Sequence, residues 1–357
     1  MGRQRSAAGR VQYHQDLHAA IGKCLPHRGL ALQVEDGRVR WTPRILATCA
    51  LLLGWSAGSN LQECFVSARE VVVAMYRSRR RPGESLAGFL QALSSQSAGL
   101  LSVVVGSLRG MTIRVSGRQW RWKEWVLMGA DGSRVECPMT RSNENGLGCA
   151  GKDKTTPQLF LPPLFHVASG LLRALQASGH DFIVRVGRNV HLLRLRGWAV
   201  SRQAVELYRL RWGIEVMYRT FKRTLEHHKM RSDTPRRAKV ELDWCMAGLW
   251  MLGLMTWQAM GNSGRRRQRP SAARALSGVR NARRNASRPR RHGGLARDLR
   301  AAVQDSYERC RPKKARHYPR KKTERPAGRP KIRTATHAEM LAAQAWGSPR
   351  APNYFAA

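Results

Sequence analysis

Acidic residues are scarce in this 357-residue chain, which has 23 Asp and Glu against 64 Lys and Arg. The formal net charge of +41 at pH 7 excludes an ordinary neutral enzyme of small metabolites. A field this positive attracts polyanions, and nucleic acid is the commonest polyanion in a cell. Because 42% of the residues are apolar, the chain is not wholly disordered. The composition therefore indicates a folded protein with a polyanionic partner.

Cysteine pairs at the spacing of a metal site are missing. The seven cysteines are an odd number, and no two of them stand in a CxxC spacing. This argues against a disulfide framework and against a zinc site, and it favours a reducing compartment.

Long apolar runs are also few. No apolar run follows the basic N-terminus, so we do not expect a signal peptide there. Residues 45–55 are too few to cross a bilayer. Residues 244–261 have the length of a marginal span, but charged flanks and the basic segments that follow favour a buried core helix. We therefore expect no membrane partner.

The first third of the chain reads as helical after a polar, flexible start over residues 1–35. Thr42-Pro43 is typical of an N-cap followed by Pro at the first helical position. Further helices are expected over 59–76 and 85–94, with a basic linker at 77–83 between them.

The middle of the chain, from residue 121 to 262, has mixed character. Its short apolar runs predict strands, and its longer periodic segments predict helices. The expected elements are a strand over 125–130 with a hairpin partner at 133–137, a loop over 141–157, a strand over 158–167 broken by Pro162-Pro163, a helix over 171–178, a strand over 182–186 with a hairpin partner at 191–195, and helices over 201–225 and 237–260.

The tail differs again in composition. Residues 264–333 hold 25 Lys and Arg against four acids, among Pro and Gly. Such a segment is expected to be disordered, or only partly helical, until it meets nucleic acid.

The most specific pattern lies in the helix expected over 201–225, where Tyr208, Arg211, Glu215 and Lys222 stand at offsets 0, 3, 7 and 14. At ~100° per residue, these positions fall within about 60° of one helix face. Such a face can be a solvated surface with ion pairs. Alternatively, its carboxylate can hold a divalent cation while its donors bind phosphate.

This stretch resembles the DDE transposases of bacterial insertion sequences, in cut-and-paste family four, marked by the Y-(2)-R-(3)-E-(6)-K signature. GADGSRVECP (129–138) is similar to the first catalytic segment of that family, and FIVRVGRNV (182–190) to its late core strand. The segment at 313–336 resembles the basic tail of one subgroup.

The resemblance implies an α/β fold with an RNase H-like mixed sheet core, in which two Asp and one Glu hold Mg²⁺ or Mn²⁺ for phosphoryl transfer. Asp131 matches the first Asp and Glu215 the Glu, as catalytic metal ligands. Tyr208, Arg211 and Lys222 match the residues that hold terminal phosphates. From the residues alone, Asp131-Gly132 can equally be a hairpin turn.

The second Asp has no counterpart. His166-Val167-Ala168-Ser169-Gly170 leads directly into Leu171, so the strand that would carry this Asp is missing. We therefore expect an internally deleted copy. The alternatives are a transposase with an incomplete active site, a non-catalytic DNA-binding remnant, and a general basic RNA- or chromosome-associated protein with a chance match.

The resemblance also implies partners and a division of the chain. The expected partner is double-stranded DNA at the terminal inverted repeats of the element, bound as a dimer in the cytoplasm at the nucleoid, with no small-molecule substrate. The expected segments are a flexible N-terminus (1–35), a helical DNA-binding domain (36–120), the catalytic core (121–262) and a basic tail (263–357). The aromatic and basic residues at 120–125 can stack on unpaired bases or pack in a core.

Overall fold

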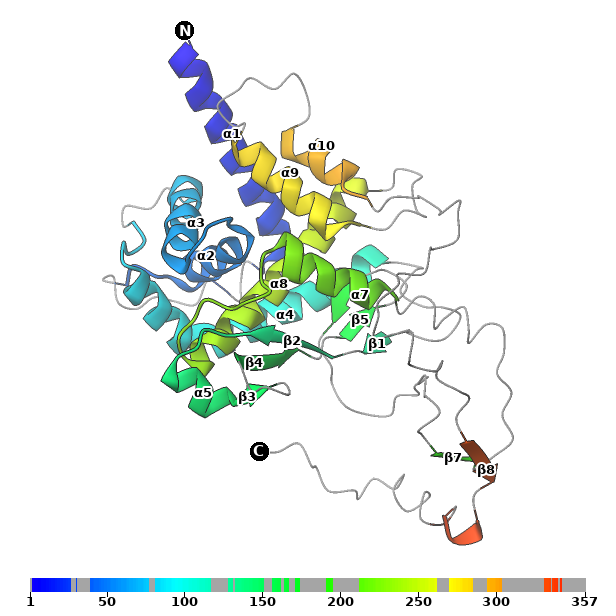
Figure 1. The fold of residues 1–357 in the computed structure, drawn as a ribbon. Coiled ribbons are helices and arrows are strands. Elements are labelled where there is room, and N and C mark those ends of the chain that lie inside the picture. Colours follow the sequence, from blue (N-terminus) through cyan, green and yellow to red (C-terminus); the bar gives the residue numbers. More distant parts are fainter. Residues whose placement is uncertain are drawn as a thin grey trace, which may run out of the picture. The chain divides into compact units, whose positions relative to one another are not determined.

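A computed structural model describes residues 2–26, 30, 39–76, 81–116, 128–130, 132–150, 156–161, 164–166, 171–173, 191–194, 212–261, 270–284, 294–303, 331–334, 336–339 and 341. The chain divides into two compact units, the first comprising Met1–Gln176 with Leu210–Asp305 and the second Ala177–Arg209 with Ser306–Ala357. The described part is mostly helical with small sheets, so the expected mixture of α and β structure is confirmed (Figure 1).

Helix α8 (Pro235–Met260) is the centre of the first unit. Thr234 caps its N-terminus by accepting a hydrogen bond from the Arg237 amide, and Pro235 occupies the first turn. Its side chains are buried along most of its length, against α2, α4, α9 and α10. The expectation of a buried core helix over residues 244–261 is therefore confirmed.

Helices α2 (Pro43–Trp55) and α3 (Leu61–Met75) begin and end close to the expected positions. Thr42 and Pro43 open α2 as the sequence predicts, although the Thr42 side chain makes no capping bond. Asn60 caps α3 by accepting from the Glu63 amide. Both helices contribute buried apolar faces to the same core as α8.

Helix α4 (Leu86–Ser116) is much longer than the helix expected over 85–94. Its buried positions Phe89, Leu93, Leu100, Val104 and Leu108 recur at helical spacing well beyond residue 94. This continuous apolar face packs on α8, so the glycines and serines between these positions do not end the helix.

Of the described helices, α4 is the one whose length and apolar composition, over Leu86–Val115, would suffice to cross a membrane. A helix packed inside a protein passes the same test. Two polar groups on α4 are buried against α8: Ser97 Oγ accepts from Trp244 Nε1 at 2.8 Å, and Thr112 Oγ1 accepts from Trp250 Nε1 at 2.9 Å.

Helix α1 (Gly2–Cys24) lies where we expected a flexible segment over 1–35. Tyr13, Leu17, Ile21 and Cys24 are buried at spacings of three and four residues. The Tyr13 hydroxyl donates to the Val279 carbonyl at 3.2 Å. Because Arg, His and Gln separate the large apolar residues here, the apolar stripe is easily overlooked.

Helices α9 (Ala272–Arg284) and α10 (Gly294–Ala301) show that the tail, which we expected to be disordered or only partly helical, is helical over part of its length. Leu276, Leu295 and Leu299 are buried, and the two helices contact each other, α1 and α8. A few apolar residues at helical spacing are enough to bury one face of an Arg-rich helix.

The strands of the first unit lie in two antiparallel sheets, which we call together the ladder because their main pairings share one register. β1 (Met128–Ala130) pairs with β5 (Leu164–His166), and β2 (Ser133–Glu136) pairs with β4 (Thr156–Leu161). Ala130 pairs with Leu164 and Ser133 with Leu161, so both pairings share one register across the two-residue intervals 131–132 and 162–163. The expected hairpin between 125–130 and 133–137 is therefore wrong.

Two further short segments, one between β2 and β4 and one after β5, also differ from expectation. The loop expected over 141–157 contains α5 (Arg141–Leu147), capped by Thr140, and β3 (Cys149–Ala150), which pairs with the start of β4. The helix expected over 171–178 is replaced at its start by β6 (Leu171–Arg173), which pairs antiparallel with β5. Pairing with β5 satisfies the backbone of these residues as a strand.

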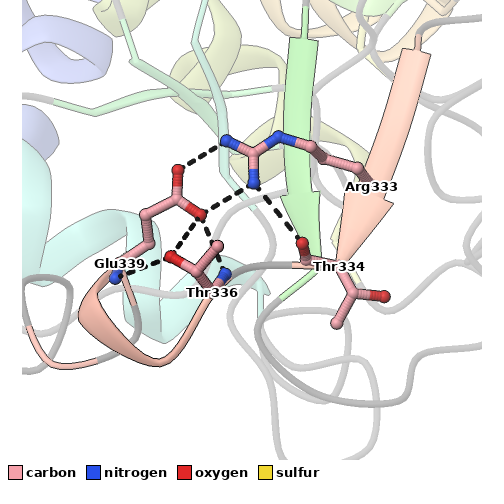
Figure 2. Close-up of polar contacts among 4 residues, drawn as sticks. All are labelled: Arg333, Thr334, Thr336 and Glu339. Atoms are coloured by element: carbon pink, nitrogen blue, oxygen red, sulfur yellow. Dashed lines mark hydrogen bonds and ion pairs between the residues drawn. The ribbon is translucent and has the colours of Figure 1, made fainter.

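The second unit contains a parallel pair of strands, β7 (His191–Arg194) and β8 (Lys331–Thr334). The hairpin partner expected for β7, residues 182–186, lies outside the described residues. The Arg333 guanidinium of β8 binds the carboxylate of Glu339, which follows the strand and also accepts from the Thr336 amide at 2.8 Å (Figure 2). Part of the tail is thus ordered through pairing with β7.

Candidate functional site

Two of the four signature residues lie on described elements. Glu215 is on α7 (Trp212–Arg219), and Lys222 is in the π-helix η2 (Thr220–Thr224) that continues it. Both side chains are half-buried. Tyr208, Arg211 and Asp131 lie outside the described residues.

We expected one continuous α-helix to carry the signature residues. Instead, the described part of this helix changes from an α-helix to a wider π-helix at η2. The Leu225 amide donates to the Thr220 carbonyl at 3.0 Å, five residues back, and the helix ends there, as the sequence predicts. The wider turn rotates Lys222 relative to Glu215, away from the stripe of a regular helix. Such π-bulges are frequent at functional sites.

The α7–η2 helix is anchored on the strands. Three of its own apolar side chains are buried, those of Ile214, Met217 and Phe221. The Tyr218 hydroxyl donates to the Leu161 carbonyl at 3.1 Å. Leu161 is the last residue of β4 and pairs with Ser133, two positions after Asp131. Glu215 stands three residues before Tyr218, on the same side of the helix.

The segment after η2 extends the strand ladder. The Glu136 amide donates to the His228 carbonyl at 3.3 Å, and the Met230 amide donates to the Glu136 carbonyl at 2.7 Å. Glu226 makes the preceding turn with a positive φ of 62°. The chain leaving η2 is thus fixed along the free edge of β2, which holds the end of the signature helix in place.

His227 secures this segment from beneath. Its ring is buried, and Nε2 lies 3.1 Å from the Gly54 carbonyl at the end of α2. Burial lowers the pKa of His227 to about 4, so the ring is neutral at pH 7 and donates from Nε2. Arg280 of α9 binds the nearby Trp55 and Thr224 carbonyls.

Glu241 binds the residues that immediately precede α8. Its buried carboxylate accepts hydrogen bonds from the Arg231 amide and from the amide and hydroxyl of Ser232. Burial raises the pKa of this carboxyl, and the hydrogen bonds oppose that shift. Asn143 of α5 binds the Ser232 carbonyl at 3.2 Å and so joins the same junction to α5.

Neither Tyr218 nor Glu241 is among the site residues predicted from the sequence. A Tyr three residues from the signature Glu, on a helix with a strong apolar face, was a signal for Tyr218. A lone acid among the buried positions of α8 was the corresponding signal for Glu241.

A metal ion would find few ligands among the residues placed so far. The part of the chain that the structure describes contains no group of three His, Cys, Asp or Glu side chains able to hold one. Of the two predicted metal ligands, Glu215 is described and Asp131 is not. The described residues alone therefore do not make a metal site.

Comparison with known proteins supports a DDE transposase family. Residues 166–252 match the family model described as Transposase DDE domain. The match runs from the end of β5 into α8 and includes Tyr208, Arg211, Glu215 and Lys222, whereas Asp131 precedes it. No curated protein and no solved structure matches the chain significantly. DDE transposases bind DNA, and their catalytic domains generally use divalent metal ions.

Proposed function

We propose that this protein is the transposase of a bacterial insertion sequence, of the YREK-signature family, which binds element-end DNA and cleaves and joins strands by metal-dependent phosphoryl transfer. The observation that carries this proposal is the bond from Tyr218 on α7 to the Leu161 carbonyl. This bond attaches the helix that bears Glu215 to Leu161, whose strand partner Ser133 follows Asp131 by two residues.

The short separation in sequence supports the meeting of Asp131 and Glu215. Asp131 stands two positions before Ser133, which pairs with Leu161, the residue whose carbonyl accepts the Tyr218 bond. Two residues of extended chain span at most about 7 Å.

Each proposed site residue then has a chemical role. Asp131 and Glu215 would hold Mg²⁺ or Mn²⁺, which when bound supplies Lewis-acid stabilisation of the transferring phosphoryl group. Tyr208, Arg211 and Lys222 would bind the phosphates next to the reacting bond through charge-assisted hydrogen bonds. The widened turn at η2 sets the direction in which Lys222 leaves the helix.

The fold part of the proposal is an RNase H-like core that has lost the strand of the second Asp. The antiparallel order of the β1–β2, β4–β5 and β6 segments supports the early part of such a sheet. Only Glu136 and Glu144 are described among the acids between Asp131 and Glu215. Glu136 is exposed on β2 and Glu144 lies on α5. The incomplete ligand set is inferred from the sequence, which has no counterpart of the second Asp.

The missing counterpart of the second Asp in the sequence favours one alternative function, a DNA-binding transposase remnant that no longer cleaves. Helices α2 to α4 would still recognise the terminal inverted repeats, as a dimer on double-stranded DNA. Like the intact enzyme, it would act in the cytoplasm at the nucleoid.

Cleavage of DNA that carries the element's own terminal repeats tests the proposal. With Mg²⁺ or Mn²⁺, we expect nicking at the repeat boundary, reduced about a thousandfold or more by Asp131→Asn and by Glu215→Gln. Glu144→Gln, a half-buried acid on α5, is the matched control and should cleave normally. Repeat-specific binding without cleavage in the unaltered protein would establish the remnant instead. Absence of repeat-specific binding would overturn both functions.

A further inference from the structure

A groove of about 830 Å³ separates α1 from α4 in the first unit. One wall comes from the C-terminal half of α1 and the residues just after it, and the other from the C-terminal half of α4. Arg44, from the first turn of α2, completes the lining. The Ser107 hydroxyl donates to the Cys24 carbonyl at 2.8 Å and fixes the spacing of the two walls.

The charge of this groove is of one sign. Lys23 from α1, Arg44 from α2 and Arg114 from α4 contribute positive charges to the lining. None of the described residues that line it is acidic. One guanidinium nitrogen of Arg44 lies 3.9 Å from the position that a Cβ atom would occupy at Gly22. The Arg44 charge therefore lies close to the α1 wall. A polyanion is the ligand that these groups complement.

The floor of the groove is made of small residues. Gly106 and Gly110 lie one turn apart on α4, and a Cβ atom added at either position would meet nothing within 4 Å. Ala19 and Gly22 face the groove from α1. A ligand can therefore approach the helix backbone closely between the basic groups of the rim.

We propose that this groove binds the sugar–phosphate backbone of DNA, an inference that rests on the proposed function for the identity of the partner. Phosphates alternate with apolar deoxyribose along the backbone, which matches a basic rim above a floor of small apolar residues. A single inorganic anion would fill only a small part of the volume. Helix α1, which precedes the helices expected to recognise DNA, thereby becomes part of the DNA interface.

Binding of a duplex with the terminal repeats, followed by fluorescence anisotropy over a range of salt concentrations, tests the charges. Arg44→Gln/Arg114→Gln should lower the steepness of the plot of log affinity against log salt by about 2, because two phosphate contacts are lost. Arg141→Gln/Arg297→Gln removes the same charge from exposed positions on α5 and α10 and is the control.

Filling the floor tests the groove without changing its charge. Leucine favours helix more than glycine does, so Gly110→Leu should fold with an unchanged or higher melting temperature while DNA binding weakens about tenfold. Gly99→Leu is the matched control. It lies on the same helix with equally open space around it but outside the groove, and it should bind DNA normally.

The outcomes separate this inference from the proposed function. If the unaltered protein binds the duplex but the groove variants behave like their controls, the groove does not hold DNA, and the proposed function stands. If the unaltered protein shows no salt-dependent binding of the duplex, both fail. Weakened binding in the groove variants alone supports the inference.

Discussion

The helices around α8 and the strands that carry α7 are stabilised in different ways. Helix α8 buries most of its length, and its Trp244 and Trp250 indoles donate to hydroxyls of α4. The strands, in contrast, are two to six residues long, and one of their large apolar side chains, Phe160, is 61% exposed. Individual hydrogen bonds, such as Tyr218 to Leu161, attach α7 to this ladder.

The stability of the protein and its predicted chemistry therefore depend on different regions. Of the predicted catalytic residues, Glu215 lies on the helix attached to the strands, and Asp131 stands between β1 and β2 in the sequence, whereas most of the large apolar core belongs to the helices. A deletion within the strand region would remove little of that core. A chain that lost the strand of the second Asp can therefore keep its helical assembly.

The largest effect is expected from Trp244→Ala. The side chain is 2% exposed, and its removal leaves a cavity between α8 and α4. The free energy of unfolding should fall by about 3–5 kcal/mol in urea denaturation. Phe160→Ala on β4 removes a large side chain from the other region and should change it by less than about 0.5 kcal/mol. Equal losses at the two positions would show that the regions do not differ in this way.

His227 provides a pH test of the contact between the regions. Burial lowers its pKa to about 4, against an ordinary value near 6.5, so the unfolded chain binds more protons between these two pH values. Stability should therefore fall as pH decreases from 6.5 to 4, by up to about 3 kcal/mol.

His227→Phe should remove most of this pH dependence, as measured by urea denaturation at several pH values. His228 is exposed and next in sequence, so His228→Phe is the control and should retain the dependence. An unchanged slope in His227→Phe would assign the pH dependence to other groups.

A smaller loss of stability than at Trp244 or His227, and the sharpest test of the site, is expected from Tyr218→Phe. Loss of the bond to Leu161 should cost about 1 kcal/mol in unfolding experiments. If this bond sets the distance between Glu215 and Asp131, cleavage of terminal-repeat DNA should fall far more than that loss explains. A variant that cleaves normally would show that the bond only supports the fold.

Local signals predicted the helices well. Thr42-Pro43 marks the start of α2, and the apolar length of residues 244–260 identified a buried helix, because both signals lie within one element. Tertiary pairing was predicted poorly. Whether β1 pairs with β2 or with β5 depends on residues some thirty positions away, and α1, α9 and α10 are held by contacts between distant segments.

The candidate site was predictable to the same extent. The spacing of Glu215 and Lys222 placed both residues on one helix and gave its end at Leu225. The π-helix between them could not be read from spacing, because it depends on how Phe221 and His227 pack beneath the helix. The anchoring of this helix on Leu161 likewise required the three-dimensional structure.

The parallel pair β7–β8 has a consequence for the synthesis of the protein. Residues 191–194 leave the ribosome long before residues 331–334, so β7 has to wait for the partner that β8 provides. A chain stopped anywhere before residue 331 keeps β7 without that partner, and unpaired strand edges promote aggregation. Shortened versions made to remove the basic tail would therefore change solubility along with charge. Substitution of the tail's arginines and lysines, with β8 left intact, separates the two effects.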